Sequence, residues 1–297
     1  MAISKAGFVT GKDDRELTEH GTAFFPIACY FDDLPWDTVQ WHWHEEFEAL
    51  FVTEGAAEVS LEKEKYIIKE GDGMFINAGA LHAIRLTTAS RCRFHSIVFH
   101  PRLVGGSKDS VFWLNYIEPL ILQNTLKSVL FDGSAAWHTK ACEFIETAWH
   151  AVVEEPFGYE FQVRSALSQL VLLLKMYLPD GGKELSEREL RDAKRIRIML
   201  QYIQEHYMEE LDTGQIARSA TISESECLRC FHKTIGMPPV RYLKQFRVQK
   251  AAELLLSTEK KIGDIGAECG FLDTSYFTKV FREIKGCAPG KYRSQGK

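Results

Sequence analysis

The chain has 297 residues, which is more than one average domain needs and enough for two. Hydrophobic residues make up 45% and charged residues 26% of it, as in a globular protein, and no run of 18 apolar residues predicts a membrane-spanning helix. The net charge of −5 is unevenly spread, because residues 191–297 hold 19 Lys and Arg against 13 Asp and Glu while the rest is acidic. The basic part could contact a polyanion, although solvated surfaces of opposite charge explain the difference equally well.

The first residues and the cysteines indicate the compartment. Residues 1–14 contain no apolar segment of signal-peptide length, so we expect a cytoplasmic protein. Seven cysteines, an odd number spread over a long chain, indicate reduced thiols rather than a disulfide framework.

Residues 20–100 are predicted to form β-structure. Short runs such as FEALFVTEG and YIIKEGDGMFINAG are rich in β-branched and aromatic residues and are separated by Gly and Asp. No helical periodicity interrupts them, which favours a small sandwich or barrel.

The run WHWHEEFE within this region carries chemistry. On an extended strand His42, His44 and Glu48 share one face, and His82 can converge on them from another strand. Three imidazoles and a carboxylate can hold zinc, iron, manganese or nickel. The same groups can instead bond the hydroxyls of a sugar or a carboxylic acid, with aromatic neighbours stacking on the ring. The aromatic candidates are Trp41, Trp43, Phe47 and Phe75. A surface hydrogen-bond network is a third interpretation.

The periodicity becomes helical after Gly105 and Gly106. Helical spacing of apolar residues predicts helices within 111–130 and 135–153 and over Glu160–Leu178. The PDGG sequence that follows, and the charged stretch after it, predict a linker between domains at 181–195.

The C-terminal hundred residues contain an internal repeat. Residues 223–243 align with 273–293, so that Phe231 matches Phe281 and Gly236 matches Gly286. Each copy reads as a helix, a tight turn and a second helix. Ser223 and Asp273 are the expected N-caps, and Glu226 is expected to complete a capping box with Ser223.

The second helix of each copy suits the major groove of DNA. Phe277, Val280 and Phe281 share one face, extended by Ile284, and hydroxyl and cationic residues take the other. Cys227 and Cys230 match the apolar Phe277 and Val280, so we expect them to pack rather than to bind metal.

The stretch IGDIGAECGFLDTSYFTKVFREIKGCAPGKYR resembles the C-terminal signature of the AraC/XylS transcription regulators. The resemblance implies two helix-turn-helix units whose second helices enter successive major grooves, with FRVQKAAELLLST as the helix between them. Carried over by position, the DNA-binding residues are Ser225, Arg229, Thr274, Ser275, Lys279 and Arg282.

The N-terminal strands resemble the cupin motifs. His42-x-His44-x-x-x-Glu48 resembles the first motif, and the run from Gly71 to His82 resembles the second, with Asn77 where proline is usual. AraC-type regulators commonly carry a cupin-like sensor without catalysis. We therefore favour an effector site made of His42, His44, Glu48 and His82 over a metal site made of the same residues, and expect no cofactor.

These observations together predict an α+β protein of two domains, an N-terminal cupin-like β-barrel followed by helices and a C-terminal all-α domain with two helix-turn-helix motifs. The expected ranges are an effector-binding domain at 1–105, a helical dimerisation or coupling region at 106–180, the linker at 181–195, and a DNA-binding domain at 196–297 with its helix-turn-helix units at about 211–236 and 262–286. The predicted function is a sequence-specific transcription regulator, not an enzyme, that binds double-stranded DNA and responds to a small-molecule effector, a carbohydrate or related metabolite. A homodimer and contact with RNA polymerase fit this reading, and the alternative is a metal-dependent cupin enzyme with a helical appendage.

Overall fold

The computed structural model describes residues 20–22, 24–34, 39–62, 64–87, 91–123, 125–178 and 186–295. Among these residues the chain divides into two compact units, an N-terminal unit up to Glu187 and a C-terminal unit from Arg188. Each unit is described by itself. None of the helices in the described ranges has the length and apolar character that crossing a membrane requires.

The N-terminal unit is built on antiparallel strands. In its described residues the strands are β1 Ile27–Leu34, β2 Val39–His42, β3 Phe47–Leu61, β4 Glu64–Lys69, β5 Gly73–Ile76, β6 His82–Leu86, β7 Cys92–Phe99 and β8 Ser128–Phe131. Five of them follow the order β1-β7-β3-β5-β8; β4 and β6 pair with the second half of β3, and β2 pairs with β6.

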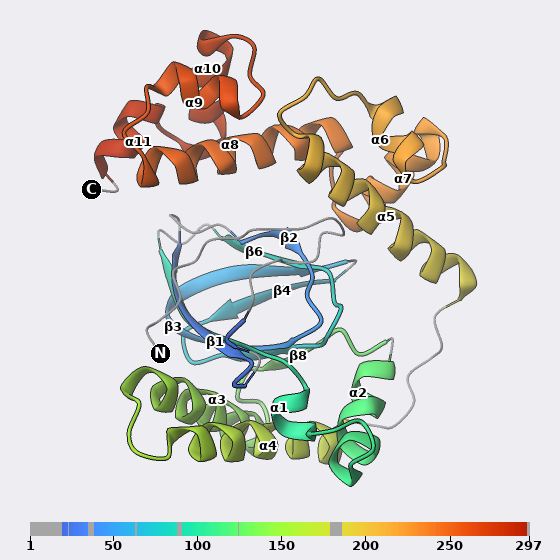
Figure 1. The fold of residues 1–297 in the computed structure, drawn as a ribbon, viewed down its shortest axis with the longest axis vertical. Helices are drawn as coiled ribbons and strands as arrows, with labels where there is room; N and C mark the ends of the chain where they lie inside the picture. The colour runs from blue at the N-terminus through green and yellow to red at the C-terminus, as the bar shows by residue number, and fades with distance from the viewer. Residues whose placement is uncertain are drawn as a thin grey trace. The chain divides into compact units, whose positions relative to one another are not determined.

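Strand β3 connects the two parts of this sheet. Its first half pairs with β5 and β7, and its second half, from Ala56, pairs with β4 and β6. The register shifts between Val52 and Glu54, and Gly55 follows with φ of +77°, where a side chain would meet the Arg91 carbonyl. This irregularity bends β3, so that the strands wrap around an interior (Figure 1).

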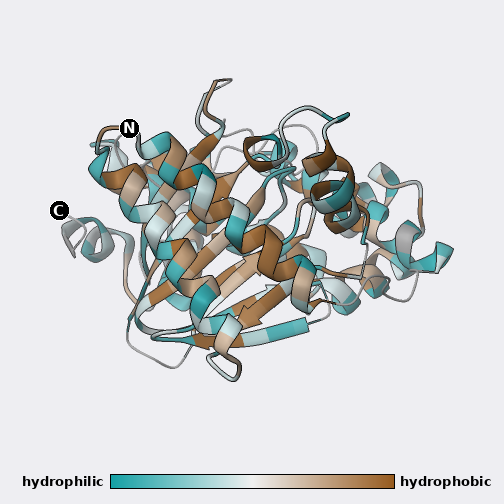
Figure 2. Ribbon diagram, turned by 90° about the horizontal axis from the view of Figure 1, so that it is seen from below, coloured by the Kyte–Doolittle hydropathy of each residue, from teal (hydrophilic) through white to brown (hydrophobic). Residues whose placement is uncertain are grey.

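Two long helices cover one face of the sheet. The helical segments of this unit are α1 Arg102–Gly105, the π-helical turn η1 Trp113–Ile117, α2 Glu118–Leu122, α3 Ala136–Glu154 and α4 Tyr159–Tyr177. Figure 2 looks from the side of α3 and α4 and shows apolar residues along the strands behind them. The helix expected within 111–130 is only partly right, because residues 128–131 form β8, which pairs with β5.

The alternation of β3 sends neighbouring residues into different surroundings. Phe47 and Ala49 lie in the core shared with α3 and α4. Leu50 and Val52 belong to a second core inside the wrapped strands. Glu48, between Phe47 and Ala49, therefore points into the interior rather than toward the helices.

The C-terminal unit is helical throughout its described residues. Its helices are α5 Glu187–His206, α6 Thr213–Ser219, α7 Glu224–Thr234, α8 Pro239–Ser257, α9 Ile262–Glu268, α10 Thr274–Lys285 and α11 Pro289–Gln295. The pairs α6–α7 and α9–α10 lie at opposite ends of α8 (Figure 1). Residues 187–195, expected to be linker, instead form the first turns of α5. The helix is stabilised by one buried apolar face, made by Ile196, Met199, Leu200 and Ile203, although its first turns are highly charged. Residues 181–185 of that expected linker lie outside the described ranges.

The two helix pairs differ at the turn between their helices. Gly270, after α9, has φ of +79°, and Thr221, at the matching place after α6, has φ of +56°. A β-branched residue in this left-handed region is strained, whereas glycine is not.

We therefore expect Thr221→Gly to raise the free energy of unfolding by on the order of 1 kcal/mol, despite the greater freedom of glycine in the unfolded chain. Chemical denaturation of the full chain, followed by circular dichroism, measures this. A variant less stable than the parent would show that the Thr221 side chain contributes more than its backbone strain costs.

Candidate effector site and DNA-binding surface

The four polar residues predicted for the N-terminal unit do come together. His42 ends β2, His44 follows two residues later, Glu48 lies on β3 and His82 begins β6. All four are buried, with exposed fractions between 0% and 5%. One ligand atom from each lies within 4.8 Å of every other. Glu46, between His44 and Glu48, contributes its backbone carbonyl, which accepts from His44 Nδ1.

Each imidazole of this cluster is held through its Nδ1 atom. The Nδ1 of His42 bonds the carbonyl of Gln40 at 2.9 Å, that of His44 the carbonyl of Glu46 at 3.0 Å, and that of His82 the carbonyl of Ala80 at 2.9 Å. Since a carbonyl can only accept, each Nδ1 carries the proton. The Nε2 lone pairs of the neutral rings are thereby left for the interior of the cluster.

Glu48 lies at the centre of the cluster. Its Oε2 is 2.9 Å from His82 Nε2 and 3.4 Å from His44 Nε2, and its Oε1 accepts from the Ser96 hydroxyl at 2.8 Å. Burial raises the pKa of Glu48, but the bonds and charge of the two histidines outweigh burial and hold that pKa well below its usual value.

The short contact between His82 and Glu48 requires a proton or a cation between the two atoms. With Nδ1 already donating, the Nε2 of a neutral His82 would turn its lone pair toward a carboxylate oxygen at 2.9 Å. Either a second proton on the imidazole or a cation between the two atoms removes this repulsion. Nitrogen and oxygen atoms gathered at this spacing are what a divalent metal takes as ligands.

The aromatic residues expected to stack on a ligand ring are mostly elsewhere. Phe47 and Phe75 contact each other in the core beneath α3 and α4, with ring centroids 5.2 Å apart. They lie on the face of the sheet opposite Glu48, so these two do not meet the condition that a stacking residue must reach the cluster. Trp41 is buried and Trp43 is partly buried.

Sequence patterns did not identify two residues beside the cluster. Ser96 stands opposite Leu50 in the pairing of β7 with β3, and a polar residue in an apolar buried strand is the signal that marks it. His20 has its ring 5.7 Å from that of His44 and its Nδ1 2.8 Å from the Tyr30 hydroxyl.

A separate cavity of about 450 Å³ lies elsewhere on the N-terminal unit. Arg102, Glu160 and Arg164 supply its charged groups, and Phe25 and Phe161 are among its apolar walls. None of its lining residues belongs to the histidine–glutamate cluster.

In the C-terminal unit, capping residues fix where the helices of each pair begin. Ser223 accepts from the backbone N–H of Glu226 at 3.3 Å, and Asp273 accepts from that of Tyr276 at 2.6 Å, as the sequence predicts. The capping box expected at Ser223 is incomplete, because the Glu226 carboxylate bonds Arg195 and Arg229 instead. Asp212 and Gln215 form a full capping box on α6.

Helix α10 presents one packed and one exposed face. Phe277, Val280 and Phe281 are buried, but Ile284 is 38% exposed and does not extend that face as expected. The exposed face contains Thr274, Ser275, Lys279 and Arg282. Among the described residues neither Lys279 nor Arg282 makes an ion pair. This face therefore offers hydroxyls near the helix N-terminus and two cations, the groups that contact bases and phosphates.

Helix α7 has the same packing but a different outer face. Cys227 and Cys230 are buried as predicted, and burial raises the pKa of the Cys227 thiol to about 11. Ser225 is exposed. Arg229 departs from the expected role of a DNA reader, because its guanidinium bonds Asp192 of α5 at 2.9 and 3.2 Å.

Comparison with known proteins covers both units. A model of the AraC-like ligand binding domain matches residues 24–141, and a helix-turn-helix domain model matches residues 216–295. The HTH-type regulator YdeC of Bacillus subtilis, named as uncharacterized, is 28% identical over 96% of this chain and 98% of its own length. The HTH-type transcriptional activator RhaS of Shigella sonnei is 24% identical over 92% of this chain and 96% of RhaS.

Among solved structures, unsaturated-fatty-acid-bound ToxT from Vibrio cholerae aligns with 93% of this chain and 97% of its own, at 13% identity and a TM-score of 0.48. The matched family models and curated relatives are transcription regulators rather than enzymes. Because its ligand-binding and helix-turn-helix regions are both matched and its relatives align along nearly its whole length, the chain belongs to the AraC family of DNA-binding transcription regulators.

Proposed function

We propose that this regulator binds specific sites near promoters and changes its DNA affinity when a small polar effector, of the carbohydrate class, occupies the N-terminal unit. The exposed face of α10 carries the DNA-binding part of the proposal. Thr274 and Ser275 stand in the first turn of the helix, where a recognition helix meets base edges, and Lys279 and Arg282 follow on the exposed surface. Ser225 has the corresponding place on α7.

The proposed effector site lies within the matched ligand-binding region. His42, His44, Glu48 and His82 form a buried polar cluster there, and buried polar groups in a binding domain orient a ligand through its hydroxyls. The ligand atoms lie within 4.8 Å of one another, which leaves room for one ion or one oxygen rather than for a sugar ring. The effector would thus offer a single hydroxyl or carboxylate oxygen to the cluster.

A DNA fragment that the full chain binds, titrated with candidate sugars and sugar acids, tests the effector proposal. We expect at least one of them to change the dissociation constant roughly fivefold or more. His44→Ala and His82→Ala should abolish the response without abolishing DNA binding. A response that survives both substitutions would instead place the effector in another site, such as the cavity between Arg102 and Arg164.

The same cluster supports a second candidate, a bound divalent metal. Backbone carbonyls fix the three imidazoles through their Nδ1 atoms, and the Glu48 Oε2 atom lies 2.9 Å from His82 Nε2. This arrangement suits a bound cation. His42, His44, Glu48 and His82 would hold the metal, and Ser96 would orient Glu48. The metal would supply a Lewis acid that binds an effector oxygen.

If a metal binds, the purified chain should contain about one divalent ion per protomer by elemental mass spectrometry. His82→Ala should remove it, and Ser96→Ala should weaken its binding roughly tenfold. His138→Ala is the matched control, since this histidine pairs with Asp132 outside the cluster. Metal content that His82→Ala leaves unchanged, or that is negligible in the parent after growth with added metals, contradicts a metal in the cluster.

The remaining partners are proposed by analogy with the family. Helices α3 and α4 would mediate a homodimer, and contact with RNA polymerase would convert DNA binding into activation. Action on a bacterial chromosome, as for its relatives, would place the protein in the cytoplasm. Sedimentation of the purified chain measures the first of these directly.

A further inference from the structure

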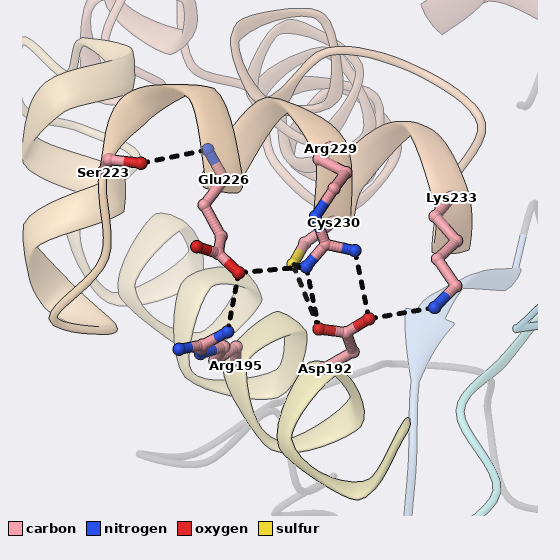
Figure 3. A network of polar contacts seen from close by, with 7 residues as sticks. All are labelled: Asp192, Arg195, Ser223, Glu226, Arg229, Cys230 and Lys233. Atoms are coloured by element: carbon pink, nitrogen blue, oxygen red, sulfur yellow. Dashed lines mark hydrogen bonds and ion pairs between the residues drawn. The ribbon is translucent and has the colours of Figure 1, made fainter. Parts of the chain in front are cut away.

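Asp192, on α5, meets the cations of α7. This carboxylate is 5% exposed, receives both Nη1 and Nη2 of Arg229 at 3.2 and 2.9 Å, and accepts from Lys233 Nζ at 2.9 Å (Figure 3). The hydrogen bond from Arg229 is the main cause that holds the pKa of Asp192 well below its usual value, and Lys233 acts in the same direction. Asp192 is therefore a charged anchor for two side chains four residues apart on α7.

A second carboxylate extends the network. Glu226 accepts from Arg229 Nη2 at 3.1 Å and from Arg195 Nη1 at 2.8 Å, so acids and bases of α5 and α7 alternate (Figure 3). The Asp192 side chain is 7% exposed, so removal of its cationic partners would leave a nearly buried charge uncompensated. A DNA phosphate would have to compete with Asp192 and Glu226 for Arg229.

The other helix pair lacks this arrangement in the part of the chain that the structure describes. Lys279 matches Arg229 in the repeat, yet it is exposed and makes no ion pair there. Glu283 matches Lys233, so α10 also differs in charge at that position. The matching cations of the two helices therefore differ: Arg229 of α7 bonds Asp192, whereas Lys279 of α10 is exposed.

We infer that Asp192 is a positioning residue that withholds Arg229 and Lys233 from the DNA backbone, so that α10 supplies most of the electrostatic attraction and α7 reads DNA mainly through uncharged groups such as Ser225. This inference rests on the proposal that both helices enter DNA. Asp192 lies near the start of α5, which begins at Glu187.

Asp192→Asn tests the inference, because the amide keeps the shape but not the charge that holds the two cations. In the full chain, the slope of log binding constant against log salt concentration, measured on random-sequence DNA, should become more negative by up to about 1.8. This is the change expected when two cations reach phosphates. Affinity for random DNA at low salt should rise roughly tenfold, so that preference for the specific site falls. Glu205→Gln is the matched control, since it removes the same charge from an exposed part of α5 where, within the described residues, Gln201 alone bonds it.

Two further variants separate positioning from mere loss of structure. Adding Arg229→Gln and Lys233→Gln to Asp192→Asn should return the salt dependence to the parent value. Lys233→Gln alone, which keeps Arg229 on Asp192, should leave the salt dependence unchanged, whereas Lys279→Gln should reduce it by about 0.9. The inference fails if Asp192→Asn matches Glu205→Gln, or if Lys233→Gln weakens salt dependence as much as Lys279→Gln. If Lys279→Gln itself has no effect, the proposed DNA-binding face fails instead.

Discussion

Gly270→Ala should lower the free energy of unfolding of the C-terminal helix pair by roughly 3 kcal/mol or more, because alanine would be strained in the left-handed backbone conformation and its Cβ would clash with backbone atoms. Gly270 has φ of +79°, and a Cβ atom there would lie 2.6 Å from the Tyr207 carbonyl oxygen and 3.0 Å from Met208 Cα. Neither contact is with a flexible side chain, so the turn between α9 and α10 would have to move. Hydrogen exchange of α9 and α10 and chemical denaturation of the full chain measure the loss.

Gly236→Ala is the matched control for this prediction. Gly236 also has a positive φ, +79°, but nothing lies within 4 Å of a Cβ built there. Its substitution should cost only about 1 kcal/mol, the strain of the backbone alone. Equal losses for the two variants would show that the close approach to Tyr207 relaxes without cost.

The double substitution Lys279→Ala and Arg282→Ala should weaken binding to a specific DNA site by roughly a hundredfold and make it less sensitive to salt. Both side chains are exposed on α10, so their removal should leave the packing of Phe277 and Phe281 intact. Fluorescence anisotropy of a labelled site, over a range of salt concentrations, gives both quantities.

Lys140→Ala controls for the loss of positive charge as such. Lys140 is exposed on α3 of the N-terminal unit, where it pairs with Glu143. Its replacement should leave DNA affinity within about twofold of the parent, because exposed pairs contribute little. If the α10 double variant binds as tightly as Lys140→Ala, the assignment of that face to DNA is wrong.

The features predictable from sequence were those with a local signature. Alternating apolar residues and glycine identified the strands, and the repeat identified both helix pairs because Phe231 and Phe281 pack alike. Four metal-ligand residue types, His42, His44, Glu48 and His82, could be grouped from the sequence, and they do come together. The single strand expected for the first three is wrong, because β2 ends at His42 and β3 begins at Phe47, with His44 between them.

The features missed depend on contacts distant in sequence. Residues 128–131 form β8 only because β5 offers an edge to pair with, which local periodicity cannot show. The charged stretch before Ile196 is helical because a stripe of α5 is buried, although its composition suggested a linker. Arg229 bonds Asp192, 37 residues earlier, a contact that its position in the family motif could not indicate.

The most direct test of the central claim, sequence-specific DNA binding through α10, is to sequence the genomic fragments that the purified full chain retains at moderate salt. The account predicts a few sharp peaks upstream of genes for the parent and their loss in the Lys279→Ala, Arg282→Ala variant. Uniform retention of fragments by both proteins, or peaks that the variant keeps, would contradict it.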